Sequence, residues 1–152
     1  MRCGLALANA NRVRPGFIGL NENDGLLTAR EVIDGLDLRG TELVLLVGCG
    51  TGRGDVLKAT EKSIAGDSLA SMRHAFEMAG AHDVIGTAWS IEPYSSQVLL
   101  GLFFEALREG QDYETSLRTA QIKAIEHPQL NAHAMLWAGF ALTGQLGRGQ
   151  SP

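Results

Sequence analysis

Residues 43–47 constrain the fold of this chain more than any other segment, because all five are leucine or valine. A strand with one solvent-facing side alternates apolar and polar residues, whereas a strand covered on both faces reads as a continuous apolar run. Residues 84–88, Val-Ile-Gly-Thr-Ala, form a second segment of this buried type. The sequence therefore predicts a sheet with helices on both faces and residues 43–47 as its central strand.

Helical patterns separate and follow these strands. Each predicted helix begins at a capping residue or a proline, and the first three end at or beside a glycine, as helices commonly do. The predicted helices are residues 29–35 after a capping box of Thr28 and Glu31, residues 68–79 with Asp67 or Ser68 as N-cap, residues 93–109 from Pro93, and residues 113–125 after Asp112.

Three shorter segments complete the prediction. Residues 4–8 read as a short strand, and residues 9–24 read as a loop that closes in a tight turn at Asp24 and Gly25. Residues 135–142 are apolar and fit a strand or a helix equally well, since a short apolar run has no decisive period. We expect an α/β fold of three or four strands, with a mostly parallel sheet flanked by helices, over residues 1–146, and a flexible tail over residues 147–152.

Composition excludes several classes of function. The formal charge of the 152 residues is −4, without a basic stripe, so nucleic acid is not an expected partner. The apolar runs are shorter than the ~20 residues that a membrane span needs, and no signal segment follows Met1. Cys3 and Cys49 share no metal-ligand spacing with other residues, so we expect no disulfide, no metal site and a cytoplasmic protein.

The glycine-rich loop of residues 48–54 follows the first buried strand and has two interpretations. Ligands and reactive groups gather at the carboxyl ends of strands in α/β sheets. In the first interpretation, the loop binds S-adenosylmethionine, as in Rossmann-like methyltransferases. That site needs an acidic residue near the strand end, and Leu46 and Val47 stand there. In the second, Cys49 is a nucleophile, and the backbone N–H groups at Gly48 and Gly50 face a developing oxyanion.

A family resemblance favours the second interpretation. Residues 24–29 and 36–44, followed by Cys49 and the Thr-Gly and Gly-Asp pairs of residues 51–55, resemble the segment around the nucleophile of CHAT domains. The likeness continues through residues 73–81, Trp89 and the Trp137 ending, which covers nearly the whole chain. CHAT domains are similar to caspases and separases, so the resemblance implies a caspase-like fold and a cysteine peptidase that uses no cofactor.

The resemblance also implies roles for single residues. Cys49 takes the position of the nucleophile. Glu92 stands about where family members that cleave after basic residues carry a carboxylate, which makes it a candidate for substrate binding. Trp89, whose usual role is in the core, is a second candidate for lining the substrate pocket. CHAT domains often follow TPR repeats, so a TPR-bearing region is an expected neighbour.

The family places its catalytic histidine before the segment that matches residues 4–8, and no histidine lies between Met1 and Cys49. The four histidines of the chain, at positions 74, 82, 127 and 133, do not match the position of the base. We expect a domain without its N-terminal strands that is inactive alone, and a polypeptide substrate or a partner chain that supplies the missing half. A non-catalytic module for protein interaction is the alternative.

Overall fold

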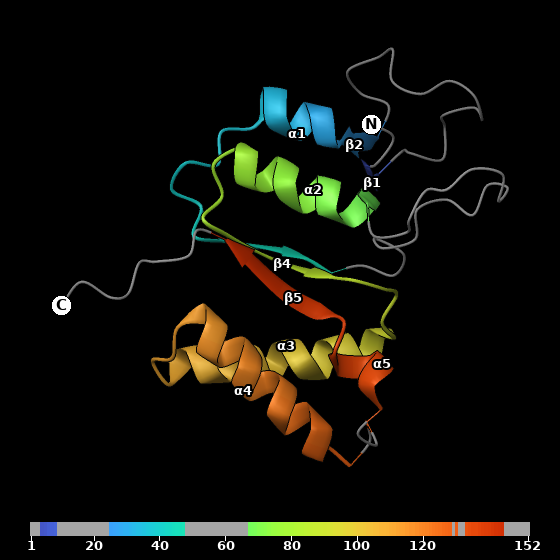
Figure 1. The fold of residues 1–152 in the computed structure, drawn as a ribbon, viewed down its shortest axis with the longest axis vertical. Helices are drawn as coiled ribbons and strands as arrows, with labels where there is room; N and C mark the ends of the chain where they lie inside the picture. The colour runs from blue at the N-terminus through green and yellow to red at the C-terminus, as the bar shows by residue number, and fades with distance from the viewer. Residues whose placement is uncertain (1–3, 9–24, 48–66, 129, 131–132, 145–152) are drawn as a thin grey trace, which may run out of the picture.

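A three-layered arrangement of helices and strands is seen in the computed structural model, which describes residues 4–8, 25–47, 67–128, 130 and 133–144 (Figure 1). A sheet of three strands forms the middle layer, in the order β3 (Leu43–Leu46), β4 (Asp83–Thr87) and β5 (Phe140–Gly144). Helices α1 (Ala29–Gly35) and α2 (Asp67–Met78) cover one face. Helices α3 (Pro93–Arg108) and α4 (Tyr113–Glu126) cover the other, and α5 (Ala134–Trp137) precedes β5.

The central strand of this sheet is β4 and not β3, which corrects the prediction from residues 43–47. Within the described part of the chain, β3 pairs with one strand and β4 with two. The central strand is also the more buried one. Three of the four β3 residues are half-buried, whereas four of the five β4 residues are fully buried. A continuous apolar run thus correctly predicted a strand between two layers of helices. It did not show whether that strand is in the centre or at the edge of the sheet.

The strand directions also correct the prediction of a mostly parallel sheet. β3 and β4 are parallel, with Leu46 opposite Gly86, but β4 and β5 are antiparallel. A second, two-stranded antiparallel sheet joins β1 (Gly4–Ala6) to β2 (Leu26–Thr28). The described residues therefore form five strands rather than the three or four expected, and one of their three pairings is parallel.

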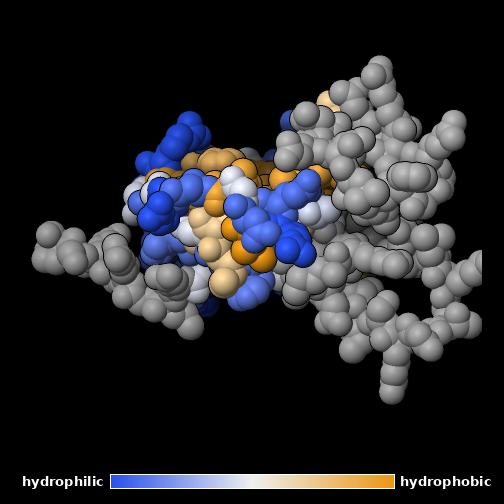
Figure 2. Space-filling model, turned by 90° about the horizontal axis from the view of Figure 1, so that it is seen from above, coloured by the Kyte–Doolittle hydropathy of each residue, from blue (hydrophilic) through white to orange (hydrophobic). Residues whose placement is uncertain are grey.

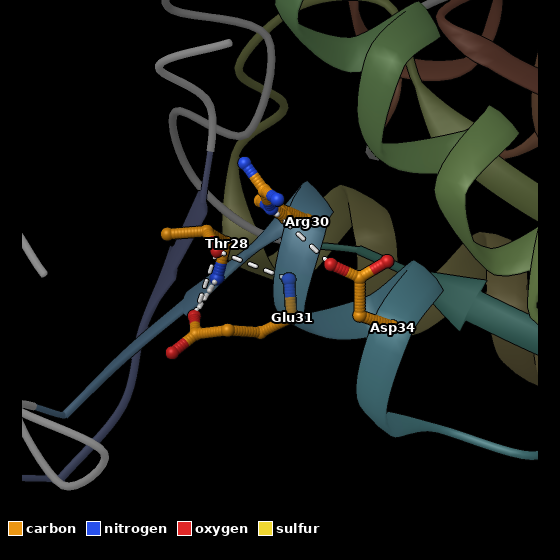
Figure 3. Close-up of polar contacts among 4 residues, drawn as sticks. All are labelled: Thr28, Arg30, Glu31 and Asp34. Carbon is orange, nitrogen blue, oxygen red and sulfur yellow. Dashed lines mark hydrogen bonds and ion pairs between the residues drawn. The ribbon is translucent and has the colours of Figure 1, made fainter.

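The predicted capping box is present at the start of α1 (Figure 3). The backbone N–H of Glu31 donates to Thr28 Oγ1 at 3.2 Å, and the backbone N–H of Thr28 donates to Glu31 Oε2 at 2.8 Å. Two N–H groups that would otherwise lack partners at a helix start are satisfied in this way. These hydrogen bonds to Thr28 hold the pKa of Glu31 below its ordinary value. On the next turn, Arg30 Nε lies 3.2 Å from Asp34 Oδ2.

Two apolar clusters hold the layers together, one on each face of the sheet. Alternate β4 residues enter opposite clusters, because successive side chains of a strand point to opposite faces. Val84 packs with the residues of α1 and α2, and Ile85 packs with those of α3 and α4. Both side chains are completely buried. The strand β4 is thus the element on which both halves of the core are built.

Residues 135–142, which fitted either structure, contain both. They complete the short helix α5, turn at residues 138–139 and start β5. Residues 140–144 form a strand because they pair with β4, with Phe140 opposite Thr87 and Leu142 opposite Ile85. The predicted tail, residues 147–152, lies outside the described residues.

Figure 2 looks onto the layer of α1 and α2 from outside and shows apolar surface beside polar side chains. Ile33 and Leu36, at the end of α1, are 36% and 39% exposed, and Met78 of α2 is 60% exposed. Scattered exposure of this kind is ordinary for a folded chain. None of the described helices is both long and apolar enough to cross a bilayer.

Candidate active site

The carboxyl ends of β3 and β4 lie at one edge of the sheet, because the two strands are parallel and Leu46 is opposite Gly86. Val47, which follows β3, leads toward the predicted loop. The predicted nucleophile Cys49 and its neighbours Gly48 and Gly50 lie outside the described residues. The other two predicted site residues, Trp89 and Glu92, follow β4 at this same edge.

Trp89 is fixed by contacts with the segment between α5 and β5. Its indole Nε1–H donates to the carbonyl of Met135 at 2.9 Å. A methyl group at Gly139 would lie only 2.9 Å from Trp89 Cε2, so the indole ring packs directly on the glycine backbone. The N–H of Ala88 donates to the carbonyl of Gly139 at 2.8 Å, which holds the two segments together. Trp89 is half-buried and therefore combines a structural role with a partly accessible surface.

Glu92 is the N-cap of α3, a role that the sequence analysis did not assign to it. Its Oε1 accepts the N–H of Tyr94 at 3.0 Å, and its Oε2 accepts the N–H and the hydroxyl of Ser95 at 2.9 and 3.0 Å. Hydrogen bonds from the backbone of Tyr94 and Ser95 hold the pKa of Glu92 below its ordinary value. The carboxylate is thus a fixed, exposed negative charge at the edge of the sheet.

The cap predicts a pH-dependent contribution of Glu92 to stability. A carboxyl group whose pKa is lowered by folding stabilises the protein above its unfolded pKa, near 4.5, and loses this contribution as the pH falls through the folded value. We expect Glu92→Gln to have a lower free energy of unfolding than the parent chain at pH 7. The gap between the two free energies should narrow below pH ~4. Denaturant unfolding at several pH values measures the gap, and an equal gap at pH 7 and pH 3 would contradict the role of the charge.

Arg73 brings a positive charge to the same edge from the opposite face. Its side chain lies across Gly86, where a built Cβ atom would be 3.0 Å from Arg73 Cδ and 3.8 Å from its Nε. The Nε atom is buried, and no atom of the described residues accepts a hydrogen bond from it. In the sequence, Arg73 was distinguished only by its place in the family likeness. Gly86 was the available signal, because glycine inside a strand often marks a close approach of another group.

The histidines lie at several places in the fold. His74 is exposed on α2, with Nδ1 3.6 Å from Glu77 Oε2. His82 precedes β4, at the amino edge of the sheet, and its Nδ1 lies 2.8 Å from Asp83 Oδ2. His127 follows α4, and His133 caps α5, where its Nδ1 accepts the N–H of Met135. No group of three or more His, Cys, Asp or Glu suited to a metal ion occurs in the described ranges.

The family to which the chain belongs follows from comparison with known protein families. The family described as CHAT domain matches residues 1–145, which is almost the full chain. The chain belongs to the CHAT-domain family. Its CHAT domain is also similar to the tetratricopeptide repeat protein 28 of Mus musculus, with 31% identity over 120 residues, and to that of Homo sapiens, with 30% over 119 residues.

These relatives are much longer than the CHAT domain described here. The alignments cover 78% of this chain but only 4% of each relative. The relatives carry tetratricopeptide repeats in their names, which agrees with the expected association of CHAT domains with TPR regions. No solved structure has significant similarity to the chain.

Proposed function

We propose that this CHAT domain is the nucleophile-bearing part of a caspase-like cysteine peptidase, with Cys49 as the nucleophile and residues 1–146 as the domain. The observation that supports this most is the family match, which spans residues 1–145 and therefore runs through Cys49. A caspase-like arrangement of the complete sheet is part of the proposal. The substrate is a polypeptide, and the chain functions in a reducing, cytoplasmic compartment in which the thiol stays free.

The edge geometry supports this function. The parallel pairing of β3 and β4 brings the strand that leads to Cys49 and the segment with Trp89 and Glu92 to one edge. Glu92 is exposed and fixed by its cap, and its Oε1 accepts one of the two hydrogen bonds that a carboxylate oxygen can accept. We propose that it contacts a lysine or arginine of the substrate, while the partly accessible indole of Trp89 lines the pocket.

The reaction needs a base that the first 48 residues do not contain, since they include no histidine. A thiol with a pKa near 8.5 is only a few per cent ionised at pH 7. We propose that a histidine from outside these 152 residues takes the thiol proton. The thiolate of Cys49 then attacks the peptide carbonyl, the C–N bond breaks, and the amine leaves with the proton from the histidine. Water hydrolyses the thioester, releasing the acid and the free thiol.

Labelling of the two cysteines tests this proposal. A peptidyl chloromethyl ketone with arginine at its reactive end, which alkylates a thiolate with loss of chloride, is added to the chain alone and to the chain mixed with a histidine-bearing N-terminal half of a CHAT domain. We expect the mixture to label Cys49 about a hundredfold faster, which is the low end of acid–base catalysis. The labelled position is read by mass spectrometry, with Cys49→Ser and Cys3→Ser as matched controls.

Other outcomes identify the alternatives. Equal labelling of Cys3 and Cys49 in the mixture would contradict the peptidase and leave a module for protein interaction as the alternative. Fast labelling of Cys49 in the chain alone would point to an internal base. The first variant to examine would then be His133→Gln, because His133 bonds Met135, whose carbonyl holds Trp89.

A further inference from the structure

We draw no further inference here: the strongest candidate, the outer edge of the apolar strand β3, at which no other strand of the described residues pairs, carries nothing because the structure does not show what covers it.

Discussion

Phe103→Ala is expected to lower the free energy of unfolding by about 3–5 kcal/mol, the usual range for removing a buried phenylalanine. Phe103 has no exposed surface and is among the largest completely buried side chains of the described residues. It belongs to the cluster between the sheet and α3 and α4, together with Ile85 and Leu99. Denaturant unfolding followed by circular dichroism measures the change, which is large for a domain whose total stability is about 5–15 kcal/mol.

The neighbouring phenylalanine provides a matched control. Phe104 has the same side chain on the same helix but is 46% exposed. Its ring contacts that of Phe103 edge to face, with centroids 5.3 Å apart, a contact that contributes about 0.5–1.5 kcal/mol. We expect Phe104→Ala to destabilise the chain by about 1–2 kcal/mol, from that contact and partial burial. Equal losses for the two variants would contradict the placement of the α3 side chains.

Gly139→Ala is expected to destabilise the chain by about 2–4 kcal/mol and to change the environment of Trp89. The new methyl group would lie 2.9 Å from Trp89 Cε2 and 3.0 Å from Ile91 Cδ1. The rigid indole must move away, which adds a lost hydrogen bond to Met135 to the usual cost of overpacking. Unfolding measures the stability, and a red-shifted tryptophan emission reports the displaced ring.

Gly101 serves as the control for this substitution. It lies in α3, and a methyl group there would meet no atom within 4 Å. Alanine is favoured over glycine inside a helix by about 0.5–1 kcal/mol, so Gly101→Ala should stabilise the chain. If Gly139→Ala has the same sign as Gly101→Ala, the close packing of Trp89 on residue 139 is wrong.

Helix boundaries were the most predictable part of this fold, because they depend on residues close in sequence. The capping box of Thr28 and Glu31 and the cap at Asp112 are both present, and Gly80 and Gly110 follow their helices with positive φ angles. Such caps satisfy backbone groups within one turn of the helix, so the sequence alone carries the necessary information.

Strand pairing was less predictable, because it depends on partners far away in the chain. β5 pairs with β4 across more than fifty residues, and nothing in residues 140–144 encodes the antiparallel direction. Strand β2 was missed for the same reason, since three residues gain a strand geometry only through pairing with β1. The apolar period identified what is buried, while the order of the strands followed from long-range contacts.

The site was predictable in part. The family resemblance placed Trp89 and Glu92 after a strand, and the parallel pairing brings that segment to the edge toward which β3 leads. The helix-capping role of Glu92 needed the positions of the Tyr94 and Ser95 N–H groups, and the buried Nε of Arg73 needed the contact with Gly86. Both are facts of packing rather than of composition.

The pairing of β5 with β4 also affects the order of events during synthesis. Residues 83–87 leave the ribosome before residues 140–144. The edge of β4 that pairs with β5 therefore has no partner while the two long helices α3 and α4 are synthesised. An open strand edge of this kind pairs readily with other chains. Until Phe140 and the residues after it arrive, the nascent domain is therefore exposed to association, and slow translation of this last stretch would lengthen that exposure.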